Sequence, residues 1–316
     1  DVLIPAYTCY SVPSAVAKAG LNIKLCDIDP KTLDFAKEQF IRIFNPPVAL
    51  DSHSIQSANS GATVNHIDPS TLLAVVPTHL YGLPSNIGFV RNTINDDRIA
   101  IIEDAAQTFC QIDQENGLGR MGDVAFFSLG RGKALTAIEG GVIVTNNHEI
   151  GTRLESAVKN IGKTNLWHNC TKLFYAIAIS SLLRPEMFWI PKALPFLHLG
   201  ETLYCPEFII GPFSPFQAGL TRRWQEKLHR SQIRRGENVR YWQHMLTGEQ
   251  YFHYHYNGKA AKNAIRYPIR IKDSILRKSI LEQSERNGLG IMPAYPSGID
   301  RIDELRDKFY GIQFNG

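Results

Sequence analysis

Short apolar runs alternate with helix-forming segments along the first half of this chain of 316 residues. The runs have the length of strands that are buried on both faces, which favours a mostly parallel sheet covered by helices. The sequence predicts strands at residues 2–4, 23–26, 72–76, 99–103, 124–128 and 142–145, and helices at 11–18, near 31–41 and near 149–161. We therefore expect an α/β fold that binds its ligand at the carboxyl ends of the strands.

The second half has a different pattern. Residues 215–246 form one long helix-compatible stretch, and a strand-like run at 265–271 and a helix at 274–287 follow it. We expect a large domain over residues 1–214, and the long helix with a small α+β domain over residues 215–316. The chain opens inside a strand-like run, without a methionine, so we expect both ends to be truncated.

The overall composition is that of a globular protein, with 44% hydrophobic and 20% charged residues. A net charge of +4 is small beside 34 basic and 30 acidic residues, which argues against nucleic acid as a partner. No CxxC pair occurs among the five scattered cysteines, a pattern typical of reduced thiols in a cytoplasmic protein. His244, His253 and His255 lack nearby carboxylate or cysteine partners, so we expect no metal site.

Two segments leave alternatives open. Residues 173–199 are rich in leucine, aromatic residues and proline, but the run is too short to span a bilayer. We expect a helical hairpin that packs on the body or on a dimer partner, with an interfacial membrane contact as the alternative. The basic run within residues 222–240 is expected to be a solvated face, and a grip on a diphosphate is its alternative.

One lysine and one aspartate indicate chemistry. Lys133 lies in the sequence FFSLGRGKALTAIEGG, between a strand and a glycine-rich turn, where loss of hydration favours its neutral amine. A neutral amine condenses with an aldehyde. Asp104 ends a hydrophobic strand upstream, where a carboxylate can keep a pyridine nitrogen protonated. The pair predicts a site for pyridoxal 5'-phosphate.

A literal dinucleotide pattern, GLGRMG, occurs at residues 117–122. Such a pattern must follow a strand and open a helix, whereas a polar stretch precedes this one and a strand follows it. GRGKAL similarly lacks the flanking residues of a phosphate-binding P-loop. Neither pattern is therefore expected to bind a nucleotide.

Five motifs occur in the order that one known family shows. They are VLIPAYT at residues 2–8, AGLNIKLCDIDPKTLDF at 19–35, VVPTHLYGLPSNI at 75–87, IIEDAAQ at 101–107 and GDVAFFSLGRGKALTAIEGG at 122–141. This set resembles the DegT/DnrJ/EryC1/StrS sugar aminotransferases, and QAGL at 217–220 and GIMPAYP at 290–296 match more weakly. The resemblance implies the pyridoxal-phosphate-dependent fold type I, with a sheet of the seven-stranded type and a smaller C-terminal domain.

The resemblance also implies roles for four residues. Lys133 would bond the cofactor covalently and move protons, Asp104 would hold the pyridine nitrogen, Gln107 would lie beside the ring hydroxyl, and Ser128 would bind the phosphate. The implied reaction moves an amino group from an amino acid, with glutamate expected, to a nucleotide-linked keto-deoxysugar. Sites of this kind are completed across a homodimer.

The chain departs from the family pattern at three positions. Cys9 stands where an aromatic residue usually stacks on the cofactor, and Ile210 and Pro212 stand where the family supplies an Asn and an Arg to the neighbouring subunit's phosphate. These departures leave a non-catalytic regulator or scaffold as an alternative. A different reaction on the same cofactor, such as sugar dehydration, is a second alternative, although lysine rather than histidine at position 133 favours transamination.

Overall fold

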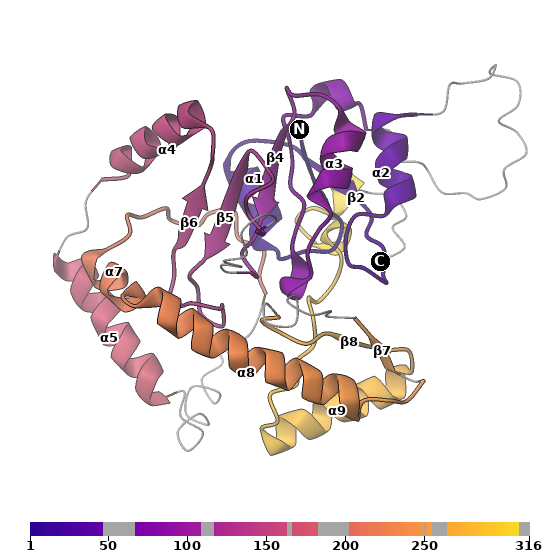
Figure 1. Ribbon diagram of the computed structural model, residues 1–316, viewed down its shortest axis with the longest axis vertical. Coiled ribbons are helices and arrows are strands. Elements are labelled where there is room, and N and C mark those ends of the chain that lie inside the picture. The colour runs from indigo at the N-terminus through magenta and orange to yellow at the C-terminus, as the bar shows by residue number, and fades with distance from the viewer. Residues whose placement is uncertain are drawn as a thin grey trace, which may run out of the picture.

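The computed structural model describes residues 1–46, 67–108, 117–162, 166–182, 202–249, 251–254 and 264–309. Its main sheet has six strands in the order β2-β1-β3-β4-β5-β6 (Figure 1). The strands are β1 (Val2–Pro5), β2 (Ile23–Cys26), β3 (Ala74–Val75), β4 (Ala100–Asp104), β5 (Val124–Ser128) and β6 (Gly141–Val144). All neighbouring pairs are parallel except β5 with β6. The predicted mostly parallel α/β sheet is confirmed.

Alternate residues of the strands fill two hydrophobic cores, one on each face of the sheet. Val2 and Ile4 of β1 pack with the buried side of helix α1 (Ser11–Lys18). Leu3, between them, packs in the other core with residues of α2 (Lys37–Phe44) and α3 (Ile87–Ile94). Helices therefore cover both faces, and the carboxyl ends of the strands are left to form a site.

The stretch predicted as one long helix is two helices. Helix α7 (Pro215–Thr221) begins with a capping box between Ser214 and Gln217, and α8 (Trp224–Met245) follows it. Between them the backbone leaves the helical region, and Arg223 takes a left-handed conformation with φ of 60°. The single-helix prediction for residues 215–246 is wrong at this junction.

A second, small sheet pairs β7 (Tyr251–His253) antiparallel with β8 (Ile269–Ile271), and α9 (Ser274–Asn287) comes after it. Beyond α9 the chain returns to the large sheet (Figure 1), where the Ile299 amide donates to the Ala6 carbonyl at 2.7 Å. Ile299 and Phe309 pack in the same core as β1. The boundary at residue 214 stays a prediction.

Two helices lie beyond β6, α4 (His148–Asn160) and α5 (Leu166–Leu182). α5 forms the first part of the apolar segment predicted at residues 173–199, and residues 183–199 lie outside the described part of the chain. Phe174 and Ile177 on α5 are exposed. None of the described helices is both long and apolar enough to cross a bilayer.

Candidate functional site

A pocket lies beyond the carboxyl ends of β4 and β5. Several separate parts of the chain contribute to its wall, among them the turn after β1 with Cys9, the loop that carries Lys133, residues 265–266 and residues 292–295. Gln107, which follows β4, also lines it. The pocket therefore lies where a parallel sheet is expected to bind its ligand.

The loop at residues 129–140, here called the lysine loop, is held by helices α7 and α8. Gln217 of α7 is buried, and its Nε2 donates to the carbonyls of Ala137 at 3.4 Å and Glu139 at 3.1 Å. Arg235 of α8 donates to the carbonyl of Lys133 itself at 3.3 Å. The lysine is thus positioned by backbone contacts, and its amine is left for the pocket.

The Lys133 side chain is half-buried in the pocket wall. Burial lowers the pKa of this lysine, and the nearby Arg266 guanidinium lowers it further, while Cys9 and Asp104 oppose the change. A lowered pKa raises the fraction of neutral amine, which is the nucleophilic form. The structure thus gives Lys133 the environment that the sequence predicted.

Asp104 ends β4 beneath the pocket and is 2% exposed. Its Oδ1 accepts from the Ala106 amide at 3.0 Å, and the Thr78 hydroxyl lies 3.5 Å from its Oδ2. Burial raises the pKa of this carboxyl, although the Ala106 amide and the charge of Lys133 lower it. Asp104 and Lys133 therefore lie close enough for each to shift the pKa of the other, as one shared site requires.

The other two predicted residues, Gln107 and Ser128, lie at different places relative to the pocket. Gln107 lines the pocket, and its carboxamide accepts from the Tyr81 amide at 3.0 Å and donates to the Tyr295 hydroxyl at 2.9 Å. Ser128 ends β5 outside the lining residues, and its hydroxyl accepts from the Gly130 amide at 3.2 Å. The roles assigned to both residues stay predictions.

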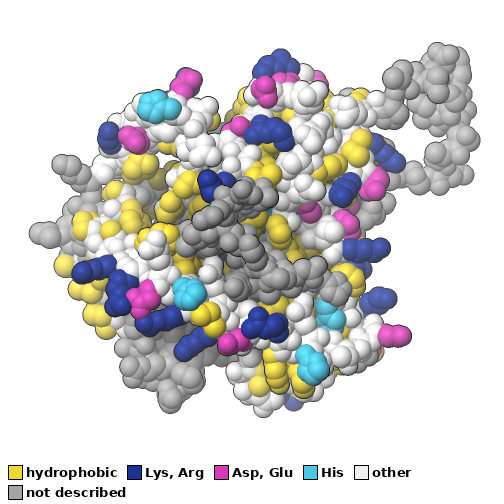
Figure 2. All heavy atoms as spheres, in the orientation of Figure 1, with side chains coloured by type: hydrophobic (Ala, Val, Ile, Leu, Met, Phe, Trp, Pro, Cys, Tyr) yellow, Lys and Arg dark blue, Asp and Glu magenta, His cyan; other side chains and the backbone are white. Residues whose placement is uncertain are grey.

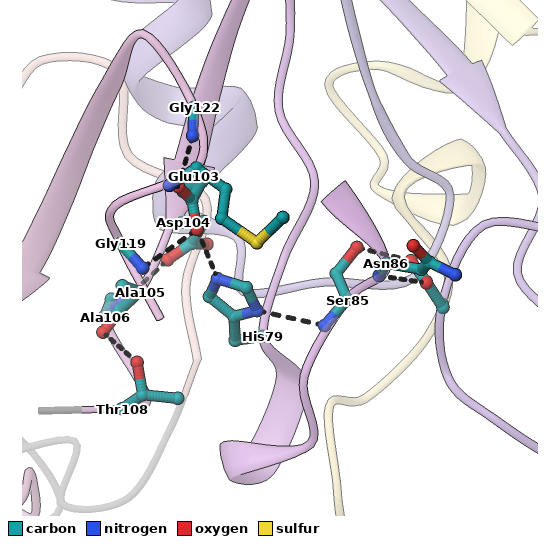
Figure 3. A network of polar contacts seen from close by, with 12 residues as sticks. His79, Ser85, Asn86, Glu103, Asp104, Ala105, Ala106, Thr108, Gly119 and Gly122 are labelled. Atoms are coloured by element: carbon teal, nitrogen blue, oxygen red, sulfur yellow. Dashed lines mark hydrogen bonds and ion pairs between the residues drawn. The ribbon is translucent and has the colours of Figure 1, made fainter. Parts of the chain in front are cut away.

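A buried pair that the sequence reasoning missed lies behind Asp104 (Figure 3). His79 Nε2 lies 3.0 Å from Glu103 Oε2, and neither side chain is exposed. His79 Nδ1 accepts from the Ser85 amide at 3.0 Å, so the ring proton is on Nε2 and is donated to Glu103. The backbone amide of His79 also donates to the Asp104 carbonyl at 3.0 Å. The pair thus fixes the strand end that carries Asp104.

The glycine pattern at residues 117–122 completes this network. The amides of Gly119, Met121 and Gly122 all donate to the Glu103 carboxylate, at 2.8 Å and 2.6 Å for the first two (Figure 3). A Cβ at Gly122 would lie 2.8 Å from the Ile101 carbonyl, which explains the glycine there. Although burial opposes the change, the bonds from His79 and Gly122 lower the pKa of Glu103, which stays ionised.

The structure also describes the surroundings of Tyr10 and of most of the titratable side chains that could bind a metal. Tyr10, the neighbour of Cys9, packs in the core with β1, and its hydroxyl contacts the Ser297 hydroxyl at 2.7 Å, outside the pocket. Among the residues that the structure describes, no three His, Cys, Asp or Glu side chains gather as metal ligands would. His255 is outside that part of the chain.

Comparison with known proteins gives relatives for this arrangement. The chain is 29% identical over 155 residues to L-glutamine:2-deoxy-scyllo-inosose aminotransferase of Streptoalloteichus tenebrarius, covering 49% of this chain and 31% of that protein. It is 26% identical over 170 residues to a UDP-N-acetyl-3-dehydro-alpha-D-glucosamine 3-aminotransferase of Acidithiobacillus ferrooxidans, covering 54% of this chain and 39% of that protein. The matched part thus spans less than two fifths of the length of either relative.

The fold matches a solved structure over most of the chain. GDP-4-keto-6-deoxy-D-mannose-3-dehydratase of E. coli, with bound hydrated PLP, superposes with a TM-score of 0.61 at 18% identity. The match covers 99% of this chain and 70% of that one, and it confirms the predicted fold type. A family profile matches residues 1–180, more than half of the sequence, so the chain belongs to the DegT/DnrJ/EryC1/StrS aminotransferase family.

Proposed function

We propose that this protein is a pyridoxal-phosphate-dependent aminotransferase. It would transfer an amino group from an amino acid, with glutamate predicted as the donor, to a nucleotide-linked keto-deoxysugar. The observation that carries the proposal is the placement of an amine with a lowered pKa, Lys133, in a pocket above a buried carboxyl, Asp104. The names of both relatives support amino transfer, and the name of the Acidithiobacillus relative supports a nucleotide-linked sugar as the acceptor.

The residues present fit this cofactor. Asp104 is buried with a raised pKa, so its carboxylate is stabilised by a ligand that brings a proton and a positive charge to that place. A protonated pyridine nitrogen supplies both the proton and the positive charge. Lys133 supplies the amine that such an aldehyde needs, and the two groups act on each other across one site.

Each residue then has a task. When bound, pyridoxal phosphate withdraws electrons from the carbon that loses a proton. The Asp104 carboxylate keeps the proton on the pyridine nitrogen, and the Lys133 amine accepts a proton and returns it within the pocket. Gln107 directs a carboxamide into the same pocket and limits how a flat ligand can lie.

The test is covalent labelling of the full-length protein. After incubation with pyridoxal phosphate and reduction by borohydride, the peptide with Lys133 is expected to carry one pyridoxyl group by mass spectrometry. Lys133→Ala should lose the label, and Lys159→Ala, at an exposed lysine of α4, should keep it. A parent protein that stays colourless and unlabelled refutes the proposal.

Separate observations support two alternatives to transamination. The fold likeness to a dehydratase favours dehydration of a keto sugar, and Cys9, Ile210 and Pro212 favour a regulator or scaffold without catalysis. Glutamate should convert the bound cofactor to its amine form if the protein transaminates. A screen of keto-sugar nucleotides with glutamate then identifies the acceptor. Transfer of the glutamate nitrogen into the sugar product supports transamination, a product without that nitrogen supports dehydration, and no binding of the cofactor supports the regulator.

We also infer that two copies associate, in the cytoplasm. Apolar side chains are exposed on the side of the molecule that carries β6 and α5 (Figure 2), among them Ile143, Phe174 and Ile177. Exposed apolar patches of this kind mark interfaces. A second copy of this chain is the expected partner, because family sites are completed across a dimer.

A further inference from the structure

The wall that residues 292–295 add to the pocket comes from far along the chain. Tyr295 is its largest side chain, and it is the one aromatic residue among the described residues that line the pocket. Its hydroxyl accepts from Gln107 Nε2 at 2.9 Å. Its ring centroid lies 6.1 Å from that of Tyr81, nearly parallel at 17°, and 5.7 Å from that of Tyr7, edge to face at 65°. The ring is therefore fixed on several sides.

The backbone around Tyr295 is fixed as well. The Tyr295 amide donates to the Tyr7 hydroxyl at 3.2 Å, and the Ser297 amide donates to the Tyr10 hydroxyl at 3.1 Å. The bond from Ile299 to Ala6 continues this series. The segment at residues 295–299 thus lies alongside the turn after β1, which carries Cys9. The Tyr295 ring is therefore held in place before any ligand binds.

The titratable groups that act on Tyr295 belong to the same site. Burial raises the pKa of Tyr295, and the nearby Cys9 and Asp104 raise it further, so the phenol stays neutral. The ring is thus an uncharged aromatic surface beside the two groups assigned to the cofactor. Such surfaces bind flat aromatic ligands by stacking or by edge contact.

We propose that Tyr295 is the aromatic residue that contacts the cofactor ring, a contact that Cys9 in the turn after β1 cannot make. The inference rests on the proposed function. The other nearby tyrosines are placed elsewhere, because Tyr7, Tyr10 and Tyr81 are absent from the pocket lining. Tyr295 links the segment after α9 to the proposed cofactor site, since its hydroxyl is held by Gln107, which follows β4.

The test measures binding of pyridoxal phosphate to the cofactor-free, full-length protein by equilibrium dialysis, together with the visible circular dichroism of the bound cofactor. Tyr295→Leu should weaken binding about threefold to tenfold, the range of one aromatic contact, and reduce the dichroic band. Tyr295→Phe keeps the ring and should keep the band.

Tyr254→Leu is the matched control. Tyr254 is buried in the apolar cluster against which Tyr295 packs, and its hydroxyl donates to the Pro30 carbonyl at 3.1 Å, outside the pocket. Its loss should lower stability without changing the dichroic band. The inference is overturned if both leucine variants bind pyridoxal phosphate equally more weakly than the parent, or if Tyr295→Leu binds it as tightly as the parent.

Misfolding of the variant and failure of the proposed function can both be distinguished from failure of this inference. If Tyr295→Leu does not fold, Tyr295→Trp decides, because a larger ring in contact must change the dichroic band and an unchanged band overturns the inference. If the parent protein does not bind pyridoxal phosphate at Lys133, the proposed function fails. If the parent is labelled at Lys133 and Tyr295→Leu binds as well as the parent, only the present inference fails.

Discussion

Burial of the Asp104 carboxyl makes folding less favourable at neutral pH. Because its pKa is raised, its stabilising contribution is complete below the ordinary value of 3.8 and is lost as pH rises through the raised pKa. Asp104→Asn carries no charge and can still accept from the Ala106 amide. We expect this variant to raise the unfolding free energy of the cofactor-free protein by about 1 kcal/mol at pH 7.

The same variant should keep the label on Lys133 and lose roughly a hundredfold in turnover, because asparagine cannot hold the pyridine proton. Urea unfolding and glutamate-dependent turnover are the two measurements. Turnover equal to that of the parent contradicts the role given to Asp104.

Glu103 has the opposite linkage to pH. Its pKa is lowered, so its contribution to stability is complete above the ordinary value of 4.5 and is lost as pH falls through the lowered pKa. Glu103→Gln should destabilise the protein by about 3 kcal/mol at pH 7, because amides and a histidine are left without a carboxylate. The difference in unfolding free energy between parent and variant should become smaller below pH 4.5.

Urea unfolding at pH 7 and at low pH measures this difference. Glu149→Gln, in the exposed pair with Arg153 on α4, is the control, and it should change stability by less than about 0.5 kcal/mol. A difference for Glu103→Gln that does not vary with pH shows that the carboxylate's charge has no part in the network.

Among the site residues, Lys133 and Asp104 could be predicted because each has a local signal. A lysine between a strand and glycines is unusual, and so is an acid at a strand end. Glu103 and His79 have no such signal, since their pairing depends on two strands that become neighbours only in the sheet. Tyr295 meets Gln107 across 188 positions of sequence, and no local pattern indicates that contact.

At the scale of the elements, Gln217 of α7 is the main link between the helices and the lysine loop. Gln217→Ala removes two bonds to loop carbonyls and half of the capping box. We expect a loss of about 2 kcal/mol in unfolding free energy. We also expect slower labelling of Lys133 under limiting cofactor, since the loop is held less firmly.

Gln283→Ala is a suitable comparison, because the side chain of this exposed glutamine on α9 donates to Ser279 of the same helix. It should leave the labelling rate unchanged. Unchanged labelling in Gln217→Ala contradicts the holding role of α7.

Element boundaries followed the sequence where the signals were local. The bounds of α1, β2, β5 and α9 agree with those predicted, because apolar periodicity and caps mark them. The helix predicted near residues 31–41 begins at Lys37, since Asp29 accepts from the Lys31 amide at 2.8 Å and forms a turn instead. The break at Arg223 has no signal, because arginine is a good helix former.

For the whole molecule, the exposed apolar side with β6 and α5 leads to a prediction about assembly. Phe174→Asp should weaken the dimer at least about tenfold, because a charge would be buried in an apolar interface. Light scattering over a range of protein concentrations measures the shift toward the monomer.

Ile275→Asp provides the control, since Ile275 is 80% exposed on α9, which is not part of the side with β6 and α5. It should leave the association constant unchanged. A parent protein that is monomeric at all concentrations and fully active refutes the inferred dimer.

The return of residues 299–309 to the core around β1 has a consequence for biosynthesis. β1 leaves the ribosome long before residues 299–309, which supply part of the apolar surface that covers it. Until then Val2 and Ile4 lack some of their native neighbours. A nascent chain of this protein is therefore expected to expose apolar surface until residues 299–309 have emerged, and to bind chaperones during that time.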